Sequence, residues 1–257
     1  MPNNDNNIQQ NAIELPYIQT LNLLYTNDIK GEAQQMAYLA TVVKQIRAAE
    51  PFILLVDSGN WSKGTLLSDK FKGMPMVEIM NELQYDAAGL GDGEFSFGSQ
   101  NLYALEGEAK FPFLCCNLIE TGTGIPPYFL EKRFHIVEKG PFKTAITGIT
   151  YPEEYPEAGL AGKDPFTILP AVLEEIKEES PDVIILLSRM GLERDKAIAR
   201  AFPSLNVIVG GGDGISMAEP HKEGNVFIVQ AGEKAETLGS LAIDMETTIK
   251  ITSSEEK

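Results

Sequence analysis

The chain has 257 residues, of which 43% are hydrophobic, and a formal net charge of −16 at pH 7. This size is sufficient for one large domain that buries roughly three quarters of the surface exposed by its unfolded chain. The strong negative charge argues against nucleic acid or an anionic membrane as the main partner, because phosphate binding requires clustered lysines and arginines. No apolar run is long enough to span a bilayer.

Both ends of the chain are predicted to lie outside the folded domain. Residues 1–13 are polar and are predicted to form a disordered tail, and residues 253–257 a frayed one. Residues 14–252 are predicted to form a single domain, because no linker composition or internal repeat marks a boundary. The N-terminal segment has no apolar stretch of the kind found in secretion signals, which predicts a cytoplasmic protein. A secreted chain whose signal had been removed would look the same.

Apolar runs of strand length alternate with helical periodicity through the first half of the chain, and hairpins are mixed in later. The predicted strands are 18–26, 52–56, 113–116, 128–137, 143–149, 182–187, 207–209, 226–231 and 238–245, with a further segment at 247–252. The predicted helices are 32–49, 75–83, 100–106, 170–179 and 193–201, with Pro170 in the first turn of its helix. This order favours two sheets over one doubly wound sheet, so we predict a four-layer α/β/β/α sandwich.

Five predicted strands end in short polar or glycine-rich segments. These are TNDIKG (26–31), DSGN (57–60), GLGDGEFSFG (89–98), SRMG (188–191) and GGGDG (210–214). Ligands of open α/β sheets bind at the carboxyl ends of the strands. We therefore expect the five segments to converge on one site.

These segments, in this order, resemble the motifs of the calcineurin-like metallophosphoesterases, and among them the 5′-nucleotidase branch. That family reads TND-x-HG, D-x-GD, GNHEFD, a histidine after an LLS strand, and GH-x-H, and the resemblance covers about residues 20–245. It implies the sandwich fold and two divalent metals, which polarise a phosphoryl oxygen and supply a hydroxide near neutral pH. It also implies a C-terminal domain that grips the nucleoside, which we expect to be missing here.

Most functional positions implied by the resemblance hold a different residue, and of the seven metal-ligand positions only Asp28 is unchanged. The other six are Lys30 for a histidine, Asn60 for the carboxylate that bridges both metals, Asp92 for an asparagine, Arg189 for a histidine, and Gly212 and Gly214 for two histidines. The catalytic histidine position holds Gly93, and the position of its orienting aspartate holds Ser96.

These replacements predict that neither metal nor catalytic residues remain. Divalent transition metals at such sites require imidazoles and carboxylates. At an effective dielectric constant of 20, a unit positive charge about 4 Å from a divalent cation is repelled by roughly 8 kcal/mol. The two histidines of the chain, His135 and His221, lie outside the motifs. No metal cofactor is therefore expected.

Lys30 and Arg189 are predicted to occupy the two former metal positions, with Asp28 and Asp92 as counter-ions. Three interpretations remain open. The ion pairs are a structural relic, or Lys30 and Arg189 form an anion-binding pocket for a phosphorylated ligand, or Asp28, Asp92, Asn60 and Glu94 support residual metal-dependent hydrolysis.

The predicted function is that of a catalytically inactive relative that binds a protein partner or a small anionic ligand, with homo-oligomer formation also possible. The alternative is a weak or unconventional metal-dependent phosphoesterase.

Four further features carry secondary predictions. Glu94 is predicted to make scaffold hydrogen bonds, and Trp61 to be a ligand platform or an aromatic cap over the site. The loop 210–214 is predicted to be a tight turn rather than a phosphate cradle. The adjacent Cys115 and Cys116 are predicted to be buried free thiols.

Overall fold

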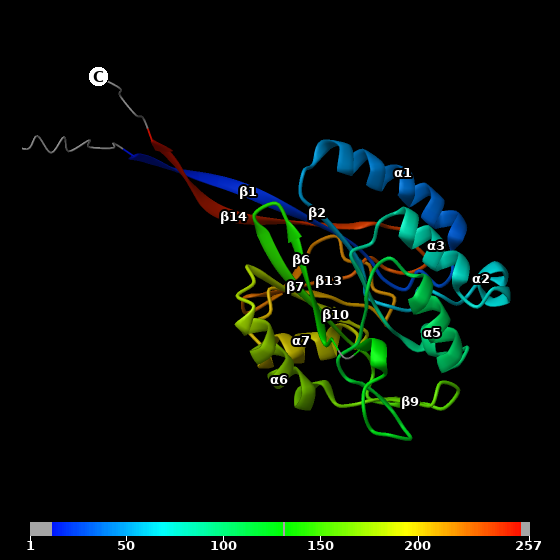
Figure 1. Ribbon diagram of the computed structural model, residues 1–257. Coiled ribbons are helices and arrows are strands. Elements are labelled where there is room, and N and C mark those ends of the chain that lie inside the picture. Colours follow the sequence, from blue (N-terminus) through cyan, green and yellow to red (C-terminus); the bar gives the residue numbers. More distant parts are fainter. Residues whose placement is uncertain (1–11, 131, 253–257) are drawn as a thin grey trace, which may run out of the picture.

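The computed structural model describes residues 12–130 and 132–252, which form two main sheets and one small sheet (Figure 1). The first sheet has the order β14-β1-β2-β3-β4, the second β12-β13-β11-β10-β7-β6, and the small one β5-β9-β8. The strands of the first sheet are β1 (Ala12–Thr26), β2 (Ile53–Asp57), β3 (Ala87–Gly89), β4 (Phe113–Leu114) and β14 (Gly239–Thr252). Those of the second are β6 (Phe134–Lys139), β7 (Phe142–Ile149), β10 (Val183–Ser188), β11 (Val207–Val209), β12 (His221–Glu223) and β13 (Val226–Val229). The small sheet contains β5 (Leu118–Glu120), β8 (Glu154–Tyr155) and β9 (Leu160–Gly162).

Helices cover the outer faces of both main sheets. The helices are α1 (Ala33–Ala49), α2 (Leu66–Lys70), α3 (Met74–Glu82), α4 (Asp92–Phe95), α5 (Ser99–Glu108), the 3₁₀ helix η1 (Tyr128–Leu130), α6 (Pro165–Glu178) and α7 (Leu192–Ala201). Apolar residues of α1, α3 and α5 pack on the first sheet, and those of α6 and α7 pack on the second. No helix in the described ranges is apolar over enough length to cross a membrane.

Strand β2 shows why the fold has four layers. All five of its residues are buried, as expected for a strand covered on both faces. Leu54 and Val56 contribute to the core between the two sheets, whereas Leu55 contributes to the core under α1 and α3. A third core lies between the second sheet and helices α6 and α7. The predicted α/β/β/α sandwich is confirmed.

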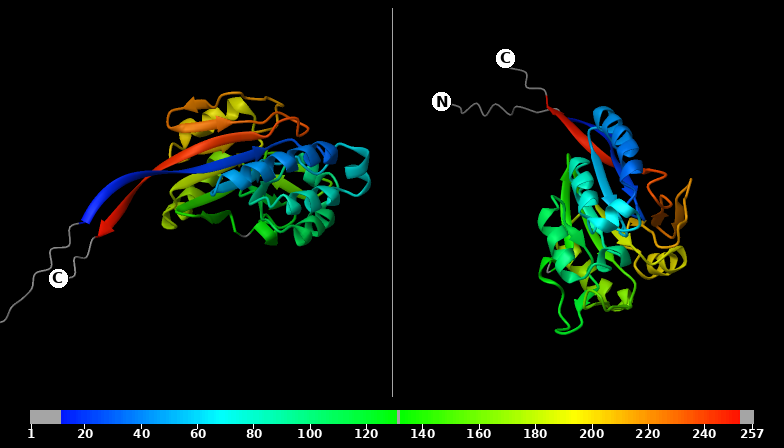
Figure 2. Two further views of the ribbon diagram at one scale, coloured as in Figure 1. Left: turned by 90° about the horizontal axis from the view of Figure 1, so that it is seen from above. Right: turned by 90° about the vertical axis from the view of Figure 1, so that its right-hand side faces the viewer.

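The longest strand pair differs from the prediction. β1 begins at Ala12, and it pairs antiparallel with β14 from Ala12 opposite Thr252 to Tyr25 opposite Gly239. The predicted strand start at residue 18 was therefore wrong, because pairing with β14 extends β1 back to Ala12. The segments predicted at 238–245 and 247–252 are one strand, β14. Figure 2 shows this ribbon extending beyond the sandwich. The tails at 1–11 and 253–257 lie outside the described residues.

Two other boundaries also differ from the prediction. Helix α6 starts at Pro165 with Asp164 as its cap, so Pro170 lies inside the helix rather than in its first turn. Burial of Leu169 and Leu173 compensates for the hydrogen bond that Pro170 removes. Residues 128–130 form η1 instead of a strand. The predicted strands 226–231 and 238–245 fall in different sheets, because β13 pairs with β11 and β12 while β14 pairs with β1.

The two cysteines are buried free thiols, as predicted. Cys115 belongs to the core on the α1 side of the first sheet, and Cys116 to the core under α6 and α7. Adjacent residues of an extended segment point to opposite faces, which explains the division. Burial raises the pKa of the Cys116 thiol to about 11.

Candidate functional site: the strand-tip cluster

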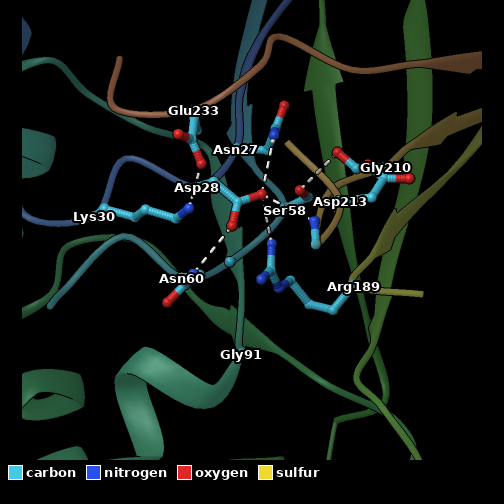
Figure 3. Close-up of polar contacts among 12 residues, drawn as sticks. Asn27, Asp28, Lys30, Ser58, Asn60, Gly91, Arg189, Gly210, Asp213 and Glu233 are labelled. Carbon is cyan, nitrogen blue, oxygen red and sulfur yellow. Dashed lines mark hydrogen bonds and ion pairs between the residues drawn. The ribbon is translucent and has the colours of Figure 1, made fainter. Parts of the chain in front are cut away.

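The sandwich brings the five polar segments to one edge. β1, β2 and β3 are parallel, and Thr26 lies opposite Asp57 in the register, so the loops that follow these strands are adjacent. Backbone hydrogen bonds join the first two loops, from Asp28 N to the Gly59 carbonyl oxygen at 3.1 Å and from Lys30 N to that of Asn60 at 3.0 Å. The segments after β10 and β11 reach the same place from the second sheet (Figure 3).

Arg189 and Asp28 form the centre of the site, which we call the strand-tip cluster (Asp28, Asn60, Asp92 and Arg189). Nη1 of Arg189 lies 2.8 Å from Oδ2 of Asp28, and only 3% of each side chain is exposed. Nη2 of Arg189 lies 3.6 Å from Oδ1 of Asp92, which is 66% exposed. The guanidinium therefore lies between the two carboxylates, with its stronger contact to the buried one.

Asp28 is held in its charged form. Its Oδ1 accepts a hydrogen bond from Nδ2 of Asn60 at 3.0 Å, and its Oδ2 accepts one from the backbone N–H of Gly212 at 2.9 Å. Burial alone would raise the pKa of Asp28, but the charge and hydrogen bond of Arg189, with the donors at Asn60 and Gly212, lower it below its usual value. Burial alone would lower the pKa of Arg189, but the charge and hydrogen bond of Asp28 outweigh it, so this pKa is raised.

Three glycines make the space that the Arg189 side chain fills. A Cβ atom at Gly91 would lie 2.8 Å from Nε of Arg189, and one at Gly211 would lie 2.8 Å from Nη1. At Gly59, which has a φ of +111°, the same atom would lie 3.0 Å from Cδ. The Nε atom is buried and has no hydrogen-bond partner in the described residues. Loops from both sheets thus close around the guanidinium.

At two positions for which the resemblance implies histidines, a side chain would meet other atoms, backbone at Gly212 and the end of the Asn60 side chain at Gly93. Gly212 has a φ of +100°, and a Cβ there would lie 2.7 Å from the carbonyl oxygen of Arg189. A Cβ at Gly93 would lie 2.4 Å from Oδ1 of Asn60. Real Cβ atoms essentially never make such approaches, so a side chain at either position requires rearrangement.

Lys30 differs from the predicted pairing. Its ammonium forms an ion pair with Glu233 at the rim, and a third of the Lys30 side chain is exposed. Glu233 lies between β13 and β14, outside the five polar segments that were predicted to form the site. Among the predicted site residues, the structure brings together Asp28, Asn60, Asp92 and Arg189, whereas Lys30 lies to one side (Figure 3).

Glu94 and Trp61 are both buried and support the loops of the site from the side of the core. The fully buried Glu94 carboxylate accepts backbone N–H groups from Asn60, Trp61, Ser62 and Gly91 at 2.8–2.9 Å. This is the scaffold role that was predicted for it. Trp61 is also fully buried, packs on Phe113, and donates its Nε1 hydrogen to the Gly89 carbonyl oxygen at 3.2 Å. The predictions of a ligand platform or an aromatic cap for Trp61 were wrong, because the ring lies in the core.

The loop 210–214 follows β11 and contacts the start of helix α7. Asp213 accepts a hydrogen bond from the backbone N–H of Leu192 at the start of α7, at 2.7 Å, and Gly212 donates to Asp28. In both contacts, polar groups of the loop bind other groups of the protein. This is consistent with the predicted turn rather than with a phosphate cradle.

Sequence reasoning missed two polar residues that hold the site together. Asn27 bridges the two sheets, since its Oδ1 accepts the N–H of Ala231 at 2.7 Å and its Nδ2 donates to the carbonyl oxygen of Gly232. Asp195 of α7 is fully buried and accepts a hydrogen bond from the Ser188 hydroxyl. Two signals were available in the sequence. Asn27 lies within the TND segment, and Asp195 lies on the apolar face of its helix, three residues before Ile198.

No group of three or more His, Cys, Asp or Glu side chains in the described ranges is placed to hold a metal ion. A cavity of about 210 Å³ lies beside the strand-tip cluster, and three carboxylates line it, those of Asp92, Glu154 and Glu157. Its lining also includes Lys63, Phe95, Ser96 and Tyr155.

Comparisons with known proteins agree with the fold and the motifs, although no family model matches the chain. The chain is 33% identical over 216 residues to a human 5′-nucleotidase, covering 74% of this chain and 37% of that protein. It is 31% identical over 218 residues to a snake venom 5′-nucleotidase of Naja atra, covering 74% and 40%. The chain thus spans only about two fifths of the length of these relatives.

Solved structures show the same fold. A 5′-nucleotidase precursor from Thermus thermophilus superposes with a TM-score of 0.74 at 22% identity, over 91% of this chain and 55% of that one. A calcineurin-like phosphoesterase from Bacillus subtilis also has a TM-score of 0.74, at 19% identity, over 93% and 91%. By sequence and by fold, the chain belongs to the 5′-nucleotidase branch of the calcineurin-like metallophosphoesterases.

Proposed function

We propose that this member of the 5′-nucleotidase family does not hydrolyse phosphate esters and acts by binding, with a protein as its main partner. The observation that carries the proposal is the buried guanidinium of Arg189 between Asp28 and Asp92. The proposal also concerns the cofactor, because a permanent cation at this place excludes the metals on which the family's chemistry depends.

Two physical arguments support the loss of metal. A guanidinium about 4 Å from a divalent cation would be repelled by roughly 8 kcal/mol at an effective dielectric constant of 20. The oxygens of Asp28 already accept hydrogen bonds from Arg189, Gly212 and Asn60, so binding a metal there would mean breaking them. The residues present do not fit a dinuclear centre.

The loss of catalysis has a steric basis as well. Gly93 and Gly212 occupy histidine positions of the family, and a Cβ atom at either one would collide with Asn60 or with the Arg189 backbone. The transition-state histidine is therefore absent, and placing one at position 93 would require the Asn60 side chain to move. Ser96, at the position of the orienting aspartate, donates its hydroxyl to the carbonyl oxygen of Asp92 at 2.7 Å.

A small phosphorylated ligand is a weaker candidate than a protein. Arg189 would have to leave Asp28 to reach an anion, and only 3% of its side chain is exposed. The neighbouring cavity is lined by three carboxylates and one lysine, which disfavours phosphate. The alternative activity, weak metal-dependent hydrolysis, is favoured by the relatives' names and by the oxygen donors of Asp28, Asn60 and Asp92.

Hydrolysis assays distinguish the proposal from this alternative. We expect no turnover of p-nitrophenyl phosphate, bis-p-nitrophenyl phosphate or AMP above the buffer rate with Mn²⁺, Zn²⁺ or Mg²⁺, and no stoichiometric metal in the purified protein by elemental analysis. Asp92→Ala is the matched variant, because its side chain is 66% exposed and its loss leaves the core intact. Metal-dependent turnover that disappears in Asp92→Ala would defeat the proposal.

A thermal-shift measurement separates the two kinds of partner. We expect millimolar phosphate or AMP to leave the melting temperature of the wild-type protein unchanged. A ligand-dependent rise in the melting temperature that is lost in Lys30→Ala would instead identify a small anionic ligand. Lys30 is suitable for this test because its side chain is partly exposed and lies at the rim.

A further inference from the structure

We infer that helix α2 and its flanks form a docking surface for an acidic polypeptide segment with apolar anchor residues. The surface, which we call the α2 patch, consists of Leu66, Leu67, Phe71, Lys63, Lys70 and Lys72. Figures 1 and 2 place α2 at the rim of the molecule, at the end opposite the β1–β14 ribbon. The inference rests on the binding role proposed above and names the surface that would perform it.

Three of the exposed large apolar side chains of the described residues lie close together in the sequence, within residues 66–71. Leu66 is 87% exposed, Phe71 53% and Leu67 48%. Single exposed leucines are common on protein surfaces, but contiguous apolar groups rimmed by polar ones mark interaction sites. Leu67 and Phe71 are four residues apart and so lie on one face of the helical turn.

The apolar groups are held outward by polar anchors on the inner side of α2. Thr65 caps the helix through the N–H of Ser68 and donates its hydroxyl to the carbonyl oxygen of Gly31 at 2.8 Å. The Ser68 side chain is buried and donates to the carbonyl oxygen of Ser62. Because Ser68 points inward, α2 cannot turn to bury Leu66 or Leu67 without breaking these bonds.

The charge of the α2 patch is opposite to that of the whole chain. Residues 63–72 contain three lysines and one aspartate, whereas the chain carries −16. Lys63 lies over the ring of Phe97 and Lys70 over that of Phe71, each at 5.6 Å from the ring centre. In the described part of the chain none of these lysines forms an ion pair, although Lys63 shares the cavity beside the strand-tip cluster with the carboxylates of Asp92, Glu154 and Glu157. Asp69 accepts the N–H of Gly64 at 2.9 Å.

An acidic polypeptide fits these features better than two other occupants. An anionic membrane is a large charged surface that would be repelled by the net charge of −16. A short peptide meets fewer of the chain's carboxylates than a flat membrane does, because charges more than about 8 Å away are largely screened at physiological ionic strength. Symmetric pairing of two α2 patches would bring like charges together.

A pair of designed peptides tests the inference directly. We expect a fluorescein-labelled amphipathic helix with glutamates on its polar face and leucines on its apolar face to bind the wild-type protein. We also expect a version with lysines in place of the glutamates to bind at least about tenfold more weakly, and acidic-peptide binding to fall as salt is raised from about 0.1 to 0.5 M. Equal binding of the two peptides, or no binding of the acidic one at about 100 μM, would refute the inference.

Substitutions locate the binding to the α2 patch. Leu66→Ser with Phe71→Ser should weaken the acidic peptide at least about tenfold, and Lys70→Glu with Lys72→Glu should reverse the preference between the peptides. The matched control is Tyr38→Ser on α1, because the exposed fraction of Tyr38, 63%, lies between those of Phe71 and Leu66, and this change should alter neither result. Because all these side chains are exposed, far-ultraviolet circular dichroism should show unchanged folding.

Two further measurements assess the competing occupants. Sedimentation with phosphatidylserine vesicles that is lost in the Leu66→Ser, Phe71→Ser variant would assign the surface to a membrane and overturn the inference. A dimer in light scattering that dissociates in the same variant would assign it to a second copy, with the same consequence. Peptide binding and phosphate-ester hydrolysis are measured separately. Hydrolytic activity would therefore refute the proposed loss of catalysis without affecting the conclusion on peptide binding to the α2 patch.

Discussion

Replacing Arg189 by alanine is expected to lower the free energy of unfolding by about 3–5 kcal/mol, because it leaves the Asp28 carboxylate buried without its partner charge. Asp28 is only 3% exposed, so water cannot replace the guanidinium at its Oδ2 without entering the space between the two sheets. The same change leaves a cavity lined by Gly59, Gly91 and Gly211, which now contact the side chain.

A double-mutant cycle of Asp28→Asn, Arg189→Met and the variant with both changes separates the ion pair from the packing. Asp28→Asn with Arg189→Met removes both charges while keeping most of the volume, and we expect this double variant to be more stable than Arg189→Ala alone. Urea denaturation followed by fluorescence of the buried Trp61 gives the free energies. Lys196→Ala is the control, since its ion pair with the exposed Glu193 lies at the surface and its loss is expected to change the free energy of unfolding little.

The prediction for Arg189 has a clear contrary outcome. If Arg189→Ala lowered the free energy of unfolding by less than about 1 kcal/mol, water would have to reach Asp28 readily. The strand-tip cluster would then be open to water rather than closely packed.

The stability of the protein is expected to fall as the pH rises from about 4 to about 7, through Asp195. Burial raises the pKa of Asp195 to about 7, and the nearby Asp213 adds to this, while the Ser188 hydroxyl and the charge of Arg189 oppose it. The unfolded chain loses the Asp195 proton near pH 4, whereas the folded chain keeps it until about pH 7. Between these values the folded state binds one more proton, so each pH unit costs about 1.4 kcal/mol.

Asp195→Asn removes this dependence. The amide keeps the size of the protonated carboxyl and cannot ionise, so we expect the variant to be more stable than the wild type at pH 8, by up to about 4 kcal/mol. At pH 4 the two proteins should differ little. Urea denaturation at pH 4, 6 and 8 measures the effect, and Asp164→Asn, an exposed helix cap for which asparagine serves equally well, is the control.

The free energy of unfolding is expected to depend somewhat on pH even in the Asp195→Asn variant. Burial also raises the pKa of Asp57 and of Glu94, so both contribute in the same direction. Asp28, whose pKa is lowered, contributes stability that is present above about pH 4 and is lost in more acidic solution. Equal slopes for wild type and Asp195→Asn between pH 4 and 7 would show that Asp195 is ionised in the folded protein at these pH values.

The alternation of strands and helices and the convergence of the five polar segments could be read from the sequence. Buried strands such as β2 are continuous apolar runs, and parallel strands place their carboxyl ends together. The length of the β1–β14 ribbon could not be read in this way. Its outer part is ordered by pairing between residues more than two hundred positions apart, and weak local signals do not report such a pairing.

By itself, the sequence determined the four layers, the family motifs and the residue at each strand tip, because these depend on local periodicity and on the order of short segments. Only the tertiary structure decided which carboxylate each cation meets, pairing Lys30 with Glu233 and Arg189 with Asp28. It also decided that Gly91 and Gly211 enclose the guanidinium. The physical reason is that these contacts join segments from two different sheets, and the distances between them are set by how the sheets pack.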